Sequence, residues 1–244
     1  EYGRMHRLER DHWWFRGKRE AVAALLRRAG AGPPRPGDRV VDVGCGTGAV
    51  LERFGAGAVA VGIDDHVDAL RYARQKGAVR LALSDARALP FGTGTVDRLF
   101  LLDVAEHVDE DARVFAEVRR VLKPDGLAVV HVPAHPWMWS PHDEAMHHVR
   151  RYTRAELAAR IGAAGLAPAV LTYTFGGILL PAAVVRGMKR RGAGGERADF
   201  GVAPGWMNRA LFGWQRLEAA WLARRSLPLG LSLAAVVRPE RGIA

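Results

Sequence analysis

Glycine occupies every second position in one turn of the chain, at Gly44, Gly46 and Gly48. A short β-branched run, 40–43, precedes this turn, and an amphipathic segment, 50–54, follows it. The pattern predicts a strand, a tight turn and a helix. Glycines let the backbone approach a ligand where any Cβ would clash, and a helix start points free N–H groups at that ligand. We therefore expect a ligand of the nucleotide type at this turn.

Acidic residues on or after the predicted strands narrow the choice of ligand. Asp42 precedes Gly44 by two residues, and a buried carboxylate there needs a partner such as a cationic amino group. Asp64 ends the second predicted strand and can accept hydrogen bonds from both hydroxyls of a ribose. Asp85 follows the third predicted strand and can accept from an exocyclic amine. These acids favour a nucleoside that carries an amino group.

The glycine spacing alone leaves a second ligand open. Gly44, Gly46 and Ala49 also satisfy the G-x-G-x-x-G/A fingerprint of dinucleotide-binding proteins, so the glycines by themselves decide little between the two. The three acids described above are what favours a nucleoside with an amino group over a dinucleotide.

Five sequence motifs, found in a fixed order, make the chain resemble the class I S-adenosylmethionine (SAM)-dependent methyltransferases. The resemblance is to the small-molecule branch that includes the ubiquinone-biosynthesis type, and it covers residues 38 to about 175. One departure is Asp125, where the family usually has glycine, and aspartate also tolerates such a turn. The five motifs are VDVGCGTG (41–48), VGID (61–64), SDA with LPF (84–86 and 89–91), DVAEH (103–107) and RVLKPDG (120–126).

The resemblance implies a role for each matching residue. The three glycines would line the methionine part of SAM, and Asp42 would orient its amino end. Asp64 would bind the ribose hydroxyls, while Asp85 and Ala86 would meet the adenine. Asp103 belongs to the loop expected between the cofactor and the acceptor, and we count it among the cofactor contacts. The product left at this site would be S-adenosylhomocysteine.

Strand and helix patterns alternate through the middle of the chain. Such alternation predicts a parallel sheet with helices on both faces and ligands at the carboxyl ends of the strands. The resemblance implies a Rossmann-like α/β fold with seven strands in the order 3-2-1-4-5-7-6, of which strand 7 is antiparallel. The predicted strands are 39–43, 58–63, 79–83, 96–102, 127–132, 166–173 and 231–237, and the predicted helices 67–76, 109–122 and 154–163.

We expect one methyltransferase domain over 1–244. Its parts are an N-terminal helical cap (1–37), a SAM-binding core (38–175), a helical insertion (176–230) and the last strand (231–238).

The N-terminal segment, 1–29, carries apolar residues at helical spacing, with Asp11 as the expected N-cap of a helix that starts near His12. It resembles the segment that covers the cofactor in some relatives. On this reading Trp14 packs over SAM and Arg19 meets its carboxylate. The alternative is a hydrophobic plug against the sheet with a solvated arginine.

Two loops carry the candidate proton-transfer residues. His107 follows strand four and could act as a base or hold its loop. His135 and His142 follow strand five, beside aromatic residues that can wall a pocket. Methyl transfer is an in-line displacement at a methyl carbon on a sulfonium, so the protein must hold the acceptor in line and remove any proton it carries. An acceptor that is already acidic needs no base.

Other residues of the second loop are expected to be structural. His148 and 151–152 should brace the loop on a helix that begins with a capping box, Thr153 with Glu156. We predict no metal site there, because a His-x4-His spacing on a loop lacks the fixed facing that a helix gives. The residues considered as ligands are His135, His142, Asp143, His147 and His148.

The insertion 176–230 has three possible roles. An apolar run, 175–185, ends in a basic cluster, 186–191, which resembles an interfacial membrane anchor. It could instead cap the acceptor pocket or form a dimer face, so we expect a monomer or a homodimer. A following helix is predicted to place its apolar residues on one face; they are Met207, Leu211, Trp214, Leu217, Trp221 and Leu222.

Composition sets the remaining expectations. The net charge of +10 is uneven: 38–175 holds 16 basic and 18 acidic residues, 1–37 holds 9 and 4, and 176–244 holds 11 and 4. The basic excess outside the core leaves anionic partners open. The single cysteine excludes a disulfide within the chain, and we see no signal peptide and no run long enough to span a bilayer. We expect a cytoplasmic protein, with a peripheral position on the inner membrane face as an alternative.

The sequence therefore favours a SAM-dependent methyltransferase that acts on oxygen, nitrogen or carbon of a small organic molecule, as in the synthesis of a specialised metabolite. A nucleic-acid acceptor is disfavoured, because no Asn/Asp-Pro-Pro-aromatic motif follows strand four. The alternatives are a peripheral membrane methyltransferase of a lipid-linked acceptor and a SAM-binding protein that does not methylate.

Overall fold

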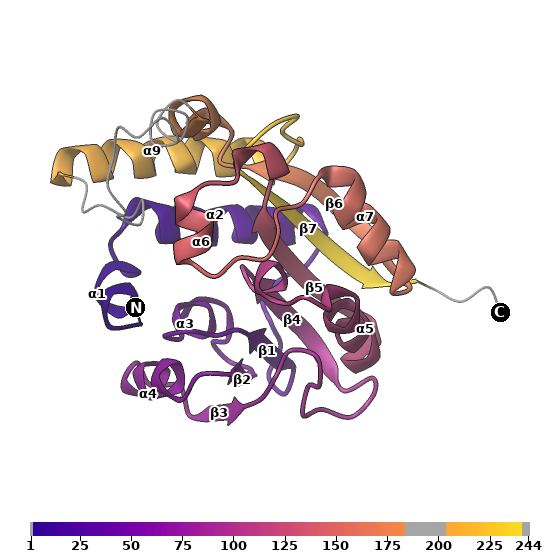
Figure 1. Cartoon of the computed structure of the whole chain (residues 1–244). Coiled ribbons are helices and arrows are strands. Elements are labelled where there is room, and N and C mark those ends of the chain that lie inside the picture. Colours follow the sequence, from indigo (N-terminus) through magenta and orange to yellow (C-terminus); the bar gives the residue numbers. More distant parts are fainter. Residues whose placement is uncertain (1, 184–203, 241–244) are drawn as a thin grey trace.

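A seven-stranded sheet with the order β3-β2-β1-β4-β5-β7-β6 forms the centre of the molecule (Figure 1). The structure is a computed structural model that describes residues 2–183 and 204–240. β7 is antiparallel to both of its neighbours, and the other pairs are parallel. The strand order and the antiparallel strand confirm the expected fold class. The strands are β1 (Arg39–Val43), β2 (Val59–Asp64), β3 (Arg80–Leu83), β4 (Val96–Leu102), β5 (Leu122–Pro133), β6 (Leu166–Thr174) and β7 (Ser232–Pro239).

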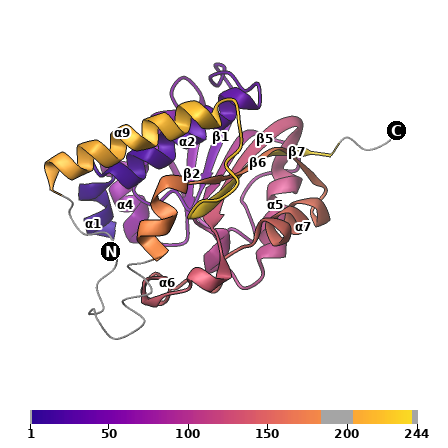
Figure 2. The same cartoon turned by 90° about the horizontal axis from the view of Figure 1, so that it is seen from above.

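Helices cover both faces of this sheet, and Figure 2 shows α2 and α9 side by side on one of them, away from α5 and α7. The α-helices are α1 (Tyr2–Leu8), α2 (Trp13–Arg28), α3 (Ala49–Phe54), α4 (Val67–Gln75), α5 (Asp111–Val121), α6 (Pro141–Ala145), α7 (Arg154–Ala163) and α9 (Gly205–Leu222). Three short 3-10 helices are η1 (Ala105–His107), η2 (Pro136–Met138) and η3 (Gly176–Ile178).

Alternate strand residues supply two separate hydrophobic cores, as the pleat of a strand requires. Val41 and Leu99 belong to the core that includes the buried faces of α5 and α7. Val40, which precedes Val41, and Phe100, which follows Leu99, belong to the core that includes α2, α3 and α9. Because both faces are buried, apolar residues follow one another directly in β1 (40–41) and in β4 (99–102) instead of alternating with polar ones.

The predicted strands and helices all occur, with shifts at their ends. The largest shift is in β5, which begins at Leu122 rather than at 127 and follows α5 directly. The loop after β5 contains short helices, η2 and α6, that the sequence pattern did not indicate.

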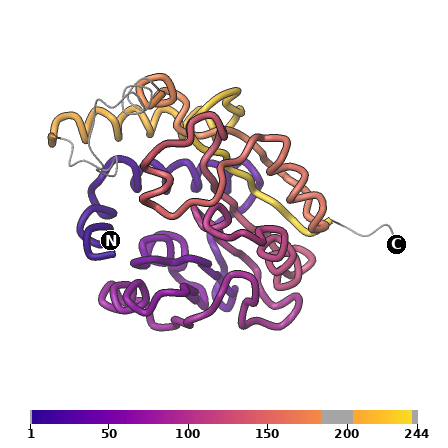
Figure 3. Tube along the Cα trace, in the orientation of Figure 1, coloured from indigo at the N-terminus to yellow at the C-terminus, as the bar shows by residue number. Residues whose placement is uncertain are grey.

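The helix predicted to start near His12 is present as α2, but its N-cap is not the expected Asp11, and the helical segment predicted over 1–29 is interrupted. The chain forms two helices, α1 and α2, separated by a turn that is visible in the tube of Figure 3. His12 is the N-cap of α2, and its Nδ1 accepts a hydrogen bond from the Trp14 N–H at 3.3 Å. Within the intervening turn Glu9 is only 1% exposed, and its carboxylate binds side chains of the core.

The predicted apolar face of α9 was also partly wrong. The side of this helix that packs on α2 buries Gln215, Glu218 and Leu222, whereas Trp214 and Trp221 are exposed. The Glu218 carboxylate accepts the N–H groups of Phe175 and Gly176, so a polar residue occupies the inner face for a specific reason.

The membrane-anchor hypothesis for 175–191 falls partly on residues outside the described ones, 184–191. Within 2–183 and 204–240, no helix has both the length and the apolar character that crossing a membrane requires.

Candidate cofactor and acceptor site

The glycine turn joins β1 to α3 and requires glycine at specific positions. Gly44 has φ +68°, and a Cβ there would stand 2.3 Å from Cγ2 of Val104. Gly48 has φ +90° and would place a Cβ 3.3 Å from the Cα of Ala73 in α4. Positive φ and close neighbours both exclude other side chains. The backbone of the turn is therefore bare, as the sequence predicted.

Replacing Gly44 by alanine should lower the free energy of unfolding by about 1–3 kcal/mol, because the new methyl meets Val104 and the backbone is left-handed. Gly37→Ala is the matched control: its φ is +90°, but no atom lies within 4 Å of the new Cβ. Denaturant unfolding of both variants measures the difference. Equal losses would show that the approach of Val104 is unimportant.

Two buried carboxylates lie beside this turn, one from β1 and one from the end of β2. Asp64 accepts the N–H groups of Gly46 at 2.9 Å and of His66 at 3.0 Å. Asp42 is 2% exposed, and among the described residues its Oδ2 has no hydrogen-bond partner. Burial raises the pKa of both groups, and the charge of Asp64 raises the pKa of Asp42 further. A cation at this point would relieve the uncompensated charge.

The substitution Asp42→Asn should raise the stability of the ligand-free protein near neutral pH while weakening SAM binding about tenfold. A carboxyl whose pKa is raised by folding stabilises the fold at low pH, and this contribution is lost as the pH rises through the folded pKa. Asparagine does not ionise, so the advantage of the variant should grow with pH. Unfolding curves at acid and neutral pH and calorimetric SAM titration test both parts.

A variant that is less stable than the parent at every pH, or that binds SAM unchanged, would contradict this account of Asp42. Asp68→Asn serves as the control, because Asp68 is exposed and pairs only with Arg71 on the surface of α4.

The turn also holds Cys45, which is 4% exposed. Burial raises the pKa of the Cys45 thiol, and the charges of Asp42 and Asp64 raise it further. The side chain is thus a small apolar filler in the neutral form.

The N-terminal helix α1 lies against the glycine turn and α4 (Figure 1). Met5 contacts Gly46 so closely that a Cβ there would meet its Cε at 2.9 Å. The buried carboxylate of Glu9 accepts from the Thr47 hydroxyl and pairs with Lys76. Through these contacts the segment 2–9 is fixed to the glycine turn and to Lys76, which follows α4. Sequence analysis missed Glu9 and Lys76, because neither stands out by pattern.

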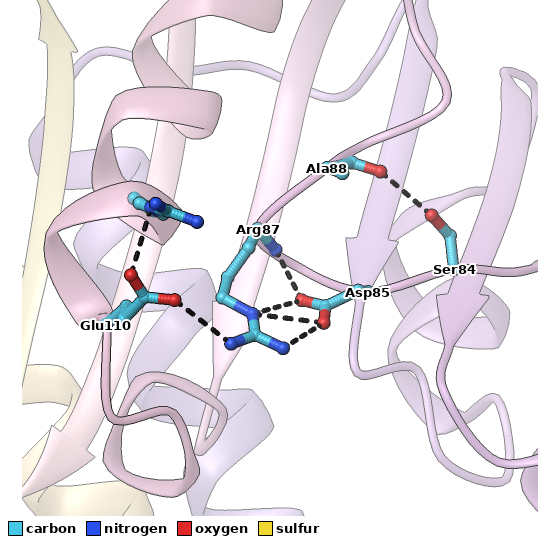
Figure 4. Close-up of polar contacts among 6 residues, drawn as sticks. Ser84, Asp85, Arg87, Ala88 and Glu110 are labelled. Carbon is cyan, nitrogen blue, oxygen red and sulfur yellow. Dashed lines mark hydrogen bonds and ion pairs between the residues drawn. The ribbon is translucent and has the colours of Figure 1, made fainter.

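Asp85 lies after β3 and is held by a neighbouring arginine (Figure 4). Arg87 binds both oxygens of Asp85, at 3.0 and 2.6 Å, and also reaches Glu110 at 3.2 Å. Hydrogen bonds from Arg87 lower the pKa of Asp85, so the carboxylate is charged. Ala86 packs against the core. Their contacts with adenine stay a prediction.

Asp103 directly follows β4, has φ +56° and is the centre of a polar network. Its Oδ1 is 2.6 Å from Nδ1 of His131, and its Oδ2 pairs with Lys18 of α2. Nε2 of His131 lies 3.2 Å from the hydroxyl of Thr174. Burial acts to raise the pKa of Asp103, but Lys18 and His131 outweigh it and lower the pKa below its usual value. The network fixes the carboxyl ends of β4, β5 and β6 to α2.

The aromatic N-terminal residues lie near this network. Trp14 stacks on Phe175, with ring centroids 4.0 Å apart, in a cluster with Met138 and Leu179. Arg19 donates to the backbone oxygen of Glu9. Cofactor contacts of Trp14 and Arg19 stay predictions, whereas Lys18, which the sequence did not single out, has the contact with Asp103.

The three candidate histidines occupy two places. His135, at φ +63°, stacks on Tyr173 with ring centroids 5.2 Å apart, and its Nε2 has no partner among the described residues. Burial lowers the pKa of His135 below its ordinary value of 6.5, which favours the neutral form. His107 and His142 instead lie near the ring of His148, with centroids 4.8 and 6.4 Å away.

The expected brace of the second loop is present. Asp143 is fully buried and accepts hydrogen bonds from His148 at 2.9 Å and from Arg151 at 2.8 Å. Arg151 also donates to the Ala134 carbonyl at 2.9 Å. The capping box of α7 forms between Thr153 and Glu156 as predicted.

Comparison with known proteins agrees with this geometry. Residues 41–130 match the family described as Methyltransferase domain. The demethylmenaquinone methyltransferase of Renibacterium salmoninarum is 35% identical over 41% of this chain and 44% of its own length. The trans-aconitate 2-methyltransferase of Azoarcus sp. is 32% identical over 58% of this chain and 55% of its own. The chain spans about half the length of these curated relatives.

Two solved structures share the fold. A Haloferax volcanii methyltransferase in complex with the Trm112 methyltransferase activator has a TM-score of 0.64 and 20% identity, over 100% of this chain and 96% of that one. Geranyl diphosphate methyltransferase in complex with SAM has a TM-score of 0.56 and 21% identity, over 90% and 85%.

The strand order and the family match over 41–130 agree with the expected class I SAM-dependent methyltransferase domain. Its core carries the motifs of the small-molecule branch, as the sequence indicated.

Proposed function

We propose that this chain transfers the methyl group of SAM to an oxygen, nitrogen or carbon atom of a small organic molecule. The observation that carries the proposal is the pair of buried carboxylates, Asp42 and Asp64, beside a bare glycine turn in a methyltransferase domain. Bound SAM supplies a methyl group activated by its sulfonium. The oxygen of Asp42 that lacks a partner would face its ammonium group, and Asp64 its ribose hydroxyls.

The acceptor side of the site would be built from the polar network of Asp103 and the aromatic cluster around Phe175. Rigid neighbours of this kind hold an acceptor in line with the methyl group, which supplies much of the rate enhancement in such displacements. We assign the role of proton acceptor to His135, because its Nε2 has no hydrogen-bond partner among the described residues and burial lowers its pKa.

Calorimetric titration with SAM and S-adenosylhomocysteine, followed by a turnover assay for S-adenosylhomocysteine over a panel of small acceptors, tests the proposal. Micromolar binding and acceptor-dependent product are expected. Binding without turnover on any acceptor would support a SAM-binding protein that does not methylate, and binding of a nicotinamide dinucleotide instead would overturn both.

One observation favours a peripheral membrane enzyme as the second candidate. The outer face of α9 exposes Trp206 (67%), Leu217 (68%) and Trp221 (51%), which recur at helical spacing. Exposed arginines flank this face at 209, 216, 224 and 225, and the helix has no exposed acid. Tryptophan beside basic residues is typical of helices that lie in a membrane interface.

Co-sedimentation with vesicles of neutral and of anionic lipid tests this candidate. Binding should require anionic lipid and should be lost in Trp206→Ser/Trp221→Ser, but not in Trp137→Ser, which removes an equally exposed tryptophan from η2. A dimer in solution that protects the same tryptophans, with no vesicle binding, would assign the face to a second copy of the chain.

A further inference from the structure

Glu106 is a buried carboxylate that lies near the charges of Asp103, Lys18 and Arg151. It belongs to η1, after β4, and is 1% exposed. Neither of its oxygens has a hydrogen-bond partner among the described residues. Burying a carboxylate without a partner is costly, so such a group takes up either a proton or a cation. Burial and the charge of Asp103 raise the pKa of Glu106, while Lys18 and Arg151 act in the opposite direction.

Two imidazoles stand beside this carboxylate. One oxygen of Glu106 and one ring nitrogen each of His107 and His148 all lie within 4.8 Å of one another. His107 is exposed, whereas Glu106 is buried, so the group is open to solvent on one side only. Two histidines and one carboxylate are a ligand set that suits first-row transition metals, with positions left for water or another ligand.

His148 is oriented by a second carboxylate. Its Nδ1 is 2.9 Å from Oδ1 of Asp143, which leaves Nε2 as the atom available to a ligand. Asp143 is itself fixed by Arg151 and by the N–H and hydroxyl of Ser140. Histidines that bind metals usually donate their other ring N–H to a carboxylate in this way, which sets the tautomer and the ring orientation. This support is a separate observation from the unpartnered oxygens of Glu106.

We propose that Glu106, His107 and His148 bind a divalent first-row transition metal ion, such as Zn²⁺ or Co²⁺. Bonds of about 2.0–2.2 Å in a tetrahedral site place the ligand atoms roughly 3.4 Å apart, so atoms that now lie up to 4.8 Å apart must move closer on binding. The bound ion would tie η1 to the loop that precedes α7 and would neutralise Glu106. From the sequence we expected no metal at the loop that includes His148, but Glu106 and His107 were not considered there as ligands.

Titration of the metal-free protein with Co²⁺, followed by visible absorption, and with Zn²⁺, followed by calorimetry, tests the site without any activity measurement. We expect one equivalent of Co²⁺ to give the absorption of a nitrogen- and oxygen-ligated ion. Glu106→Gln should weaken binding at least tenfold, and Zn²⁺ should raise the melting temperature of the parent but not of this variant. Asp143→Asn should weaken binding about 10- to 100-fold through His148.

The matched control is His66→Ala. His66 belongs to the other group of possible ligands, Asp64, Asp65 and His66, so this variant should bind the metal like the parent. Loss of binding in His66→Ala with full binding in Glu106→Gln would place the ion at the other group and overturn the proposal. Absence of stoichiometric binding in the parent would overturn it as well, and Glu106 would then be a protonated core residue. None of these results depends on whether SAM binds.

Discussion

Replacing Asp64 by alanine should weaken SAM binding by roughly 1–3 kcal/mol, or about 5- to 150-fold in dissociation constant. Two effects combine. The variant loses the charged acceptor for the ribose hydroxyls, and it also releases the N–H groups of Gly46 and His66 that the carboxylate now holds. The glycine turn would then be less ordered before the ligand arrives, which adds to the cost of binding.

Asp65→Ala is the matched control for this experiment. Asp65 is the next residue and also a carboxylate, but it is exposed, and its carboxylate pairs with the ring of His66. Calorimetric titration of both variants with SAM separates the two carboxylates. If Asp64→Ala binds SAM with the affinity of the parent, the ribose role assigned to Asp64 is wrong.

Replacing His135 by glutamine should lower kcat by about a hundredfold or more for an acceptor that must lose a proton, with SAM affinity unchanged. The lowered pKa of His135 has a consequence with a definite sign. The neutral, proton-accepting form persists below pH 6.5, so the parent should keep its activity to a lower pH than an ordinary histidine would allow.

The pH profile of kcat distinguishes this role from a purely structural one. In His135→Gln the acid limb should disappear from the profile along with the rate. His142→Gln and His107→Gln test the other candidates under the same conditions. A variant of His135 that retains the full rate and the full pH profile would remove it from the reaction.

Much of the fold could be predicted because local patterns specify it. The glycine turn requires bare backbone, and the alternating patterns of strands and helices indicate a parallel sheet with helices on both faces. The strand order itself came from the family resemblance and not from these patterns. Capping at Thr153 was predictable for the same reason: both partners lie within one turn of helix.

Other features could not be predicted because distant contacts decide them. Glu9 turns inward to meet Thr47 and Lys76, and this contact accompanies the break of the N-terminal segment into two helices. α9 buries Glu218 because the N–H groups of 175–176 need an acceptor, which overrides the apolar pattern.

The candidate site shows the same division. Spacing indicated the acids on β1 and β2, but no pattern could rank Lys18 above Arg19, because the choice depends on which side of α2 faces Asp103. Glu106 was part of a motif that the sequence singled out, yet its burial follows only from the packing of η1.

The chemical reactivity of Cys45 can report how often the glycine turn opens locally. Thiol reagents attack the thiolate, and this side chain is both shielded and kept protonated where it stands. Labelling of Cys45 should therefore occur only while the surrounding turn is locally open. The labelling rate then measures how often that opening occurs. Because the sequence contains no other cysteine, ligand binding at the glycine turn could be followed in the unmodified protein as slower labelling of Cys45.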